Sequence, residues 1–283
     1  DSQCVTHGEE SFLVEGSFSS ENNRLEQVVC GYSRRGGKIL KRNGKEYDKL
    51  SEHIGHFPIV VVSPSDSDLI SDSAEERRKY LNRLISQTDR QYLAAVIRYN
   101  QALQERNKLL KVNPSEEMLL IYDMMLDECA KTIFERRTKA VEQLLPLVER
   151  YYALLSSDRE RIGMQYRSDL QEGTMADMLL ASRRKDFINE HTTVGIHRDD
   201  VIFTIAEYPL RKFGSQGQQK SFLVALKLAE YTLLAEHNNE KPILLLDDLF
   251  DKLDMGRVAQ LLRLVGSEIF GQIFITDCNK HRL

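Results

Sequence analysis

Residues 242–248, with the sequence PILLLDD, decide the fold class of this chain. Four apolar residues in a row predict a buried strand, and the same pattern at residues 58–62 is consistent with a strand buried on both faces, as in parallel sheets. Open α/β sheets bind ligands at the carboxyl ends of their strands, which is where Asp247 and Asp248 fall. The first carboxylate suits Mg²⁺, and the second suits the orientation or activation of an attacking water. The alternative is a strand that ends in a solvated turn, where aspartate is common.

A glycine-containing turn, GSQGQQ at residues 214–219, precedes the two acids and opens a predicted helix. The helix is expected from Ser221 to Glu236, with its apolar residues on one face. Such a turn exposes backbone N–H groups to an anion, and the helix dipole adds to the attraction. The alternative is an ordinary N-cap, in which the Ser215 hydroxyl caps its own helix. The candidate anion-binding residues are Ser215, Gln216, Gly217 and Gln218.

The end of the chain alternates between strands and helices. Apolar runs predict strands at 201–205, 243–246 and 272–276, and amphipathic runs predict helices at 221–236 and 257–265. This alternation predicts a largely parallel sheet.

The front of the chain predicts a meander of strands up to about residue 63. Gly36-Gly37 and Asn43-Gly44 mark tight turns within it, because both pairs accept positive φ angles. From about residue 73 to 190 the apolar residues recur at helical spacing, with a break at Asn113-Pro114 and an expected kink at Pro146. We therefore predict an α/β fold with an inserted helical lobe. The head comprises residues 1–72 and 191–283, and the helical arm comprises residues 73–190.

Composition leaves the partners open. The chain has 283 residues, a net charge of −4 and 41% hydrophobic residues, which is typical of a globular protein. The sequence contains no apolar run long enough to span a membrane and no secretory signal, and its four cysteines are scattered. We therefore expect a reduced, cytoplasmic protein. Because bulk charge does not predict a nucleic-acid partner, DNA binding would require a local basic patch.

The candidate DNA contact is a group of six cations on a predicted hairpin. They fall within twelve residues that include no acid, and so could neutralise several phosphates: Arg34, Arg35, Lys38, Lys41, Arg42 and Lys45. Other basic runs lie on the predicted helices: Arg77-Arg78-Lys79, Arg136-Arg137 and Arg183-Arg184-Lys185. The alternative for each cluster is a solvated face without a ligand.

The turn and the two acids together resemble the signature loop and Walker B strand of ABC-type ATPases, including their SMC-like members. Ser215, Gly217 and Gln218 match the LSGGQ signature, whereas Gly214 and Gln216 depart from it. The resemblance implies that Asp247 is the metal-site acid and that Asp248 replaces the usual catalytic glutamate. Leu253-Asp254 matches the end of the D-loop, and Asp277 stands where the switch histidine would follow the last strand.

With these departures from the common pattern, the motifs resemble those of one branch of the superfamily, the RecF family. The motifs SQGQQ, Asp-Asp and LFDKLD, and the segment TTVGIHRDD at residues 192–200, are similar to that family's motifs, although Ile196 stands where proline is usual. Ser63-Pro64, followed by Asp66 and Asp68, resembles another of its stretches. The last four residues of the 192–200 segment have two interpretations, a functional element or a buried ion-pair turn: His197, Arg198, Asp199 and Asp200.

The resemblance implies a cytoplasmic repair ATPase that uses ATP and Mg²⁺ and acts in DNA replication, recombination and the SOS response. It implies an ATP-dependent homodimer on double-stranded or gapped DNA, with slow hydrolysis, which helps mediators such as RecR to load recombinase. The signature loop would complete the ATP site of the partner subunit. We expect a P-loop ahead of Asp1, because no GxxxxGK[ST] string is present, and without one the chain would not hydrolyse ATP.

Three alternatives remain open at this level. The first is a non-enzymatic DNA-binding scaffold, which the missing P-loop favours. The second is another SMC-like repair ATPase, including the overcoming-lysogeny-type nucleases, although no separate cluster of nuclease acids follows. The third is an ABC transporter subunit, whose helical insertion is normally smaller and leads directly into LSGGQ.

Overall fold

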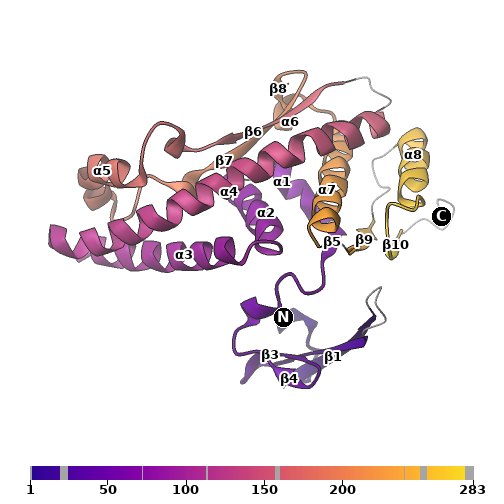
Figure 1. The fold of residues 1–283 in the computed structure, drawn as a ribbon, viewed down its shortest axis with the longest axis horizontal. Helices are drawn as coiled ribbons and strands as arrows, with labels where there is room; N and C mark the ends of the chain where they lie inside the picture. Colours follow the sequence, from indigo (N-terminus) through magenta and orange to yellow (C-terminus); the bar gives the residue numbers. More distant parts are fainter. Residues whose placement is uncertain are drawn as a thin grey trace. The chain divides into compact units, whose positions relative to one another are not determined.

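The computed structural model of this chain describes residues 2–19, 25–71, 73–112, 114–156, 160–238, 240–248 and 254–277. The chain divides into two compact units, residues 1–57 and 58–283 (Figure 1). Asn113, residues 249–253 of the D-loop-like motif and Cys278 lie outside the described residues. Within the described ranges, no helix is both long enough and apolar enough to cross a bilayer.

The smaller unit contains an antiparallel sheet whose strands pair in sequence order. The strands are β1 (Ser11–Ser19), β2 (Leu25–Ser33), β3 (Gly37–Arg42) and β4 (Lys45–Glu46). Asn43 and Gly44 have φ angles of 51° and 80° in the turn between β3 and β4, as a two-residue hairpin turn requires. The meander predicted up to about residue 63 is confirmed only as far as β4, because the next strand, at Ile59–Val62, belongs to a separate parallel sheet.

The larger unit contains a three-stranded parallel sheet in which β9 is the central strand. The strands are β5 (Ile59–Val62), β9 (Ile243–Asp247) and β10 (Ile273–Thr276). On one face Val60 and Leu244 are fully buried, whereas on the other face Val61 and Phe274 are 42% and 51% exposed. Parallel sheets normally have both faces covered. The second face is thus an apolar surface that the described residues leave open.

Helices make up most of the larger unit. They are α1 (Asp68–Ser71), α2 (Ala74–Ser86), α3 (Arg90–Leu110), α4 (Glu116–Ser156), α5 (Met175–Asn189), α6 (Leu210–Phe213), α7 (Gln216–Asn238) and α8 (Met255–Val265). The longest, α4, has 41 residues, and the helical assignment continues through Pro146. At 1.5 Å per residue α4 is about 60 Å long. It provides a common surface, because α3, α5 and α7 all pack against it (Figure 1).

One strand, β6 (Ile162–Arg167), lies inside the stretch predicted to be helical. Ile162, Met164 and Tyr166 are buried and alternate with more exposed residues, which is the period of a strand with one covered face. β6 pairs antiparallel with β7 (Asp200–Ile205), and β7 pairs antiparallel with β8 (Tyr208–Pro209). The expected parallel sheet is therefore wrong for the strand at 201–205, because that strand pairs with neighbours absent from the prediction.

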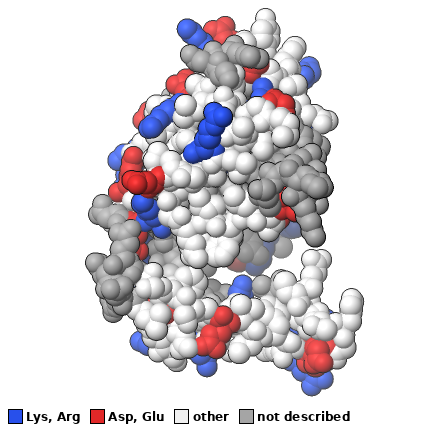
Figure 2. Space-filling model, turned by 90° about the vertical axis from the view of Figure 1, so that its right-hand side faces the viewer, with Lys and Arg blue, Asp and Glu red and all other residues white. Residues whose placement is uncertain are grey.

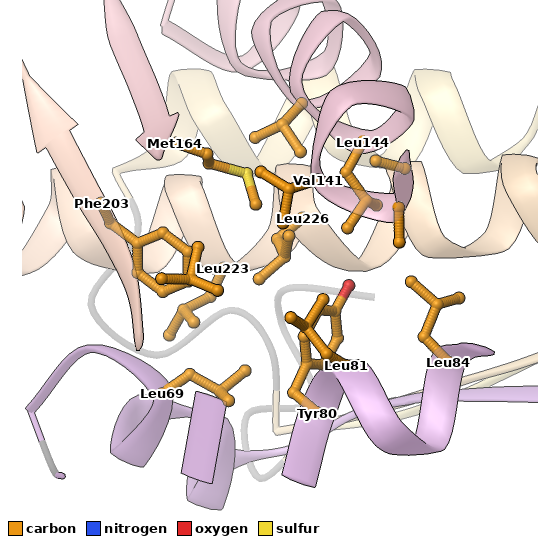
Figure 3. Close-up of a cluster of buried hydrophobic side chains, with 14 of the residues drawn as sticks. Leu69, Tyr80, Leu81, Leu84, Val141, Leu144, Met164, Phe203, Leu223 and Leu226 are labelled. Carbon is orange, nitrogen blue, oxygen red and sulfur yellow. The ribbon is translucent and has the colours of Figure 1, made fainter. Parts of the chain in front are cut away.

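One buried core connects the helices of the larger unit with β5, β6, β7 and β9 (Figure 3). Residues Ser221 to Tyr231 of α7 are all buried, because this helix packs against both α4 and β5. The side chains labelled in Figure 3 are Leu69, Tyr80, Leu81, Leu84, Val141, Leu144, Met164, Phe203, Leu223 and Leu226. Burial of each of these leucine side chains stabilises the folded state by about 1.5–3 kcal/mol relative to leaving it exposed to water. Residues of the predicted arm, 73–190, and of the predicted head both contribute to this core. The division of the chain into a head and an arm stays a prediction.

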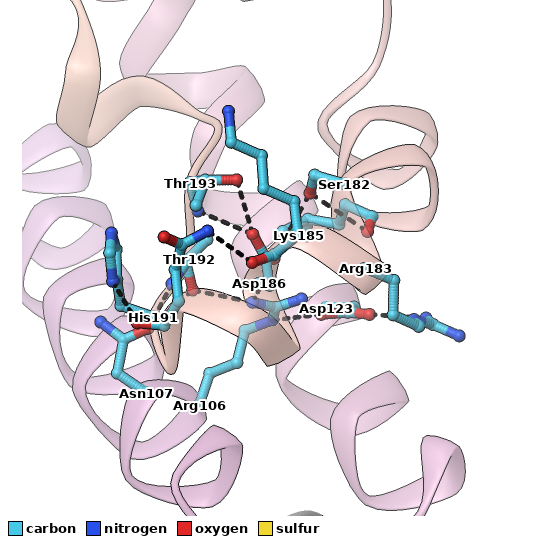
Figure 4. Close-up of polar contacts among 12 residues, drawn as sticks. Arg106, Asn107, Asp123, Ser182, Arg183, Lys185, Asp186, His191, Thr192 and Thr193 are labelled. Carbon is cyan, nitrogen blue, oxygen red and sulfur yellow. Dashed lines mark hydrogen bonds and ion pairs between the residues drawn. The ribbon is translucent and has the colours of Figure 1, made fainter.

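A fully buried guanidinium, that of Arg106 in α3, joins several elements (Figure 4). Arg106 Nε donates to Asp123 of α4 at 2.7 Å, and Nη1 donates to Asp186 of α5 at 2.8 Å. Nη1 also donates to the Thr192 hydroxyl at 2.8 Å, and Asp186 accepts from the amide of Thr193 at 2.9 Å. Because an unmatched buried charge is costly, these contacts specify how α3, α4 and α5 pack together.

We predict that Asp186→Asn destabilises the larger unit by about 3 kcal/mol or more, because it leaves Arg106 buried without one of its carboxylates. Urea unfolding followed by far-UV circular dichroism measures the loss. The control is Arg98→Met, whose ion pair with Glu128 is exposed, at 49% and 65% of the two side chains. Such pairs contribute at most about 1 kcal/mol. Equal losses in the two variants would contradict the role given to Asp186.

Candidate functional site

Asp247 and Asp248 lie at the carboxyl end of β9 and directly after it, as the sequence predicts. The parallel pairing places Thr276, the last residue of β10, beside Asp247. Thr276 Oγ1 donates to Asp247 Oδ1 at 2.6 Å, and the Thr276 carbonyl accepts from the amide of Asp248 at 3.2 Å. Thr276 was not among the predicted site residues, and its only signal in the sequence is that it ends a predicted strand. Its hydroxyl orients the Asp247 carboxylate.

Asp248 lines a cavity of about 220 Å³ together with Pro64, Ser67 and the first turns of α7. Its φ angle of 46° falls in the left-handed region, which aspartate adopts more readily than most residues. Oδ1 of Asp248 is buried, and within the described residues it has no hydrogen-bond partner. A buried carboxylate oxygen without a donor costs free energy. Asp248 as a residue lines the cavity, so a molecule bound there, such as an ordered water, could donate to its carboxylate group.

The acids fit a magnesium ion only in combination with oxygens of a bound ligand. In the part of the chain that the structure describes, no group of three or more His, Cys, Asp or Glu side chains could hold a metal alone. Mg²⁺ is commonly bound by one or two carboxylates, with water and phosphate oxygens in its other positions. Asp247 is exposed, and because Oδ1 accepts from Thr276, Oδ2 is the oxygen available to a metal.

The turn before α7 forms a capping box. Ser215 Oγ accepts from the amide of Gln218 at 3.3 Å, and Gln218 Oε1 accepts from the amide of Ser215 at 2.6 Å. Gln218 Nε2 also donates to Glu160 at 2.6 Å, which links the turn to the residues before β6. α7 consequently begins at Gln216, five residues before the predicted start at Ser221. The N-cap interpretation of Ser215 is confirmed.

The same turn keeps two backbone donors. The amides of Gln216 and Gly217 donate to no acceptor among the described residues. Unpaired amides at the start of a 23-residue helix retain the physical basis of an anion site. The cap uses the Ser215 hydroxyl and the amide of Gln218, whereas an external anion would use the amides of Gln216 and Gly217. The cap is therefore compatible with anion binding by this turn, which stays a prediction.

Asp254, the described end of the D-loop-like motif, caps α8. Its Oδ1 accepts from the amide of Arg257 at 2.9 Å. Arg257 Nη1 donates to the Ser221 hydroxyl at 2.9 Å, so the start of α8 is connected to α7. Leu253 lies outside the described residues. A D-loop role for Asp254 stays a prediction.

Acids oppose part of the basic hairpin. Arg42 forms an ion pair with Glu26 of β2, and Lys41 lies 3.8 Å from Glu46 of β4. The hydrogen bond that Arg42 donates to the Glu26 carboxylate raises the pKa of Arg42. The expectation of six unopposed charges is therefore wrong, because the sheet brings in acids from outside the twelve-residue window. The exposed members of the group are Arg34, Arg35, Lys38 and Lys45.

Ion pairs also engage most of the basic runs on the helices. The pairs are Arg77–Asp200, Lys79–Glu76, Arg136–Asp89, Arg137–Asp199 and Arg183–Asp123. Figure 2 shows a face of the molecule on which basic and acidic side chains are interspersed and a wide area carries few charges. On the described part of that face, DNA phosphates would have to be bound by a few individual basic side chains, because no broad basic patch is present there.

The segment His197-Arg198-Asp199-Asp200 is a turn held by ion pairs. Asp199, 2% exposed, pairs with Arg137 at 3.1 Å and accepts from the Tyr166 hydroxyl. Asp200 binds Arg77 through both carboxylate oxygens, at 2.6 and 3.1 Å. The geometry matches the ion-pair interpretation, since the turn connects β7 to α2 and α4.

Several curated proteins are similar to this chain. No family model matches the chain. Three curated relatives are named "DNA replication and repair protein RecF". They are those of Bacteroides thetaiotaomicron (42% identical over 100% of this chain and 77% of the relative), Flavobacterium johnsoniae (44%, over 99% and 79%) and Parabacteroides distasonis (45%, over 100% and 78%).

Solved structures give the same result. A structure described as "the recombination mediator protein RecF-ATP in RecFOR pathway" is 31% identical, with a TM-score of 0.89 over 99% of this chain and 78% of its own. An SMC head bound to a domain of ScpA has a TM-score of 0.52 over 96% of this chain and 67% of its own. At 11% identity, the SMC head shows a shared fold alone. The relatives' identity and coverage confirm the resemblance and the fold class, so this chain belongs to the RecF family of DNA replication and repair proteins.

Proposed function

We propose that this protein is an ATP-dependent DNA-binding protein of recombinational repair, which dimerises on DNA when ATP is bound. The observation that carries the proposal is Asp248, which lines the cavity at the carboxyl edge of the parallel sheet and has one buried carboxylate oxygen without a partner among the described residues. Its hydrolysis of ATP is slow, as suits a switch between assembled and released states. The protein assists mediators such as RecR in loading recombinase at DNA gaps, in the cytoplasm. The "RecFOR pathway" in the description of the solved relative supports this context.

The two acids have separate roles in the proposal. Asp247, held by Thr276, supplies a carboxylate oxygen to Mg²⁺, and Asp248 accepts a proton or hydrogen bond from the attacking water. When bound, ATP would supply the phosphate group that is cleaved, and Mg²⁺ would neutralise its negative charge. The solved relative with ATP supports the choice of nucleotide.

A phosphate-binding P-loop is needed as well. None of the 283 residues forms a GxxxxGK[ST] string. The open apolar face of the parallel sheet, with Val61 and Phe274, supplies a surface on which a P-loop helix from elsewhere in a longer protein would pack. Tests of hydrolysis therefore use a form of the protein that carries the P-loop.

The signature turn acts on the partner subunit in this proposal. The free amides of Gln216 and Gly217 would bind phosphate oxygens of ATP held by the other subunit, so that ATP joins the two copies. Asp254 would lie at the same subunit interface. The competing function is a non-enzymatic DNA-binding scaffold, which one observation favours: Ser215 is already used as a cap within its own helix.

We predict that Asp248→Asn leaves ATP binding nearly unchanged but slows hydrolysis by about 100-fold or more, because a positioned base is lost. Phosphate release under single-turnover conditions and a nucleotide-binding titration measure the two effects. Thr276→Val is a useful companion variant, since it removes only the hydroxyl that orients Asp247 and should give a smaller loss. Hydrolysis by Asp248→Asn within a few-fold of the parent would remove Asp248 from this role.

We predict that Ser215→Arg abolishes ATP-dependent dimerisation, because a long cation fills the approach to the signature turn. Ser215→Ala is the matched control, since it loses the same cap at a cost of about 1 kcal/mol and adds no bulk or charge. Light scattering with and without ATP gives the oligomeric state, and a titration checks that each monomer still binds nucleotide. If Ser215→Arg dimerises like the control, the turn is only a helix cap and the scaffold function is favoured.

We predict that replacing Arg34, Arg35 and Lys38 with alanine weakens DNA binding equally across sequences. The slope of log affinity against log salt should flatten by about 0.9 for each DNA phosphate that these cations no longer neutralise. Fluorescence anisotropy over a salt series measures this slope. Lys41→Ala is the control, because Glu46 already opposes that charge. An unchanged slope in the triple variant would move the DNA-binding site to another surface.

A further inference from the structure

A cavity of about 230 Å³ lies among α2, α3, α4 and the turn at Ile196–Arg198, apart from Asp248 and the start of α7. Three cationic residues line it, Arg78, Lys79 and Arg137, against one acid, Glu75. We propose that this cavity binds a phosphate group. The proposal goes beyond the ATP-dependent function above, since the two cavities share no lining residue.

Arg78 is the first reason. Its neighbours Arg77 and Lys79 form ion pairs, with Asp200 at 2.6 Å and with Glu75 at 2.9 Å. Within the described residues Arg78 forms no ion pair, and its Nη1 donates to the backbone carbonyl of Asp199 at 2.7 Å. One N–H is thus anchored, while the charge and the remaining donors of this half-buried guanidinium are left for a ligand.

Arg137 is the second reason, because it places another positive charge on the wall of the same cavity. It is 3% exposed, and its Nη1 donates to the Ile196 carbonyl at 2.8 Å and to Asp199 at 3.1 Å. Burial, followed by the charge of Arg137, lowers the pKa of Arg78. An anion between the two guanidinium groups would offset both effects.

Neutral donors complete the cavity. Asn82 Oδ1 accepts from the Tyr92 hydroxyl at 2.6 Å and from Arg137 Nη2 at 3.1 Å, so the amide nitrogen of Asn82 is the atom left to donate. Asn100, which is exposed on α3, also lines the cavity and offers a second amide. The acid Glu75 is offset by Lys79 at 2.9 Å.

His197 shapes the wall without adding charge. The Thr192 carbonyl can only accept, so Nε2 of His197 donates to it at 3.2 Å. Nδ1 then accepts from the Tyr99 hydroxyl at 2.9 Å. Burial lowers the pKa of His197 to about 4, which keeps the ring neutral at physiological pH. The ring therefore holds the turn and Tyr99 in place beside the cations.

Phosphate fits these groups better than a carboxylate does. Donors approach from α2, α3 and α4, which suits a tetrahedral anion with several oxygens, and guanidinium groups match phosphate geometry. Lys79 is paired with Glu75 and Arg137 with Asp199, so among the described residues Arg78 supplies the unpaired positive charge that suits an anion. Two sources share this chemistry, a phosphate of the DNA backbone and a free phosphate.

The first test is calorimetric titration of the 283-residue chain with inorganic phosphate. Arg78→Gln should weaken binding about tenfold or more, since a hydrogen-bonded charge is lost. Arg83→Gln is the control, because Arg83 is exposed on the same helix and does not line the cavity. Asn100→Asp should also weaken binding, by repulsion, whereas Gln104→Glu adds the same charge one turn further along α3. This second pair of variants leaves the Arg78–Asp199 contact intact.

The second test distinguishes the sources, using a short fluorescein-labelled DNA duplex and a salt series. If the group is a DNA phosphate, Arg78→Gln should flatten the salt slope by about 0.9 and the control should not. If only inorganic phosphate binding falls, the natural ligand is a free phosphate. A loss confined to Arg78→Gln and Asn100→Asp in either assay supports the proposal. Phosphate and DNA binding that are the same in these variants and their controls would overturn it.

Discussion

The burial of α7 is the constraint on which the rest of the larger unit depends. From Ser221 to Tyr231 every residue of this helix is buried, because α4 packs against it as well as β5 of the parallel sheet. A helix enclosed in this way cannot rotate or slide without exposing apolar surface. Its first turn is therefore held beside Asp248. Because α7 packs between α4 and β5, a movement of α4 relative to the parallel sheet would also displace α7.

Buried guanidinium groups supply the second level of organisation. Arg106 and Arg137 each collect acceptors from several segments, and both bind the stretch that connects α5 to β7. Burying a charge contributes little stability when it is fully paired, but leaving it unpaired is costly. Such pairs therefore specify one arrangement of the helices, whereas the apolar core alone would tolerate several. The cavity beside Arg78 is formed by the same arrangement.

Much of the fold and part of the site follow from the sequence alone. The buried strand ending in Asp247-Asp248, the hairpin turn at Asn43-Gly44 and the capped start of α7 are local patterns, since hydrophobic period, turn chemistry and capping act over a few residues. The order of the motifs was sufficient to identify the family. Local patterns did not predict β6, whose short alternating run lies within a long helical stretch and is stabilised by pairing with β7.

Tertiary structure alone decided which charges and donors are available. The sequence by itself determined that Arg42, Arg78 and Arg137 are cations within basic runs. Only the fold brought Glu26 to Arg42 and Asp199 to Arg137, and left Arg78 without a carboxylate among the described residues. Similarly, only strand pairing placed Thr276 against Asp247. The physical reason is that a residue's type fixes its charge, whereas its solvation and partners depend on segments far away in the chain.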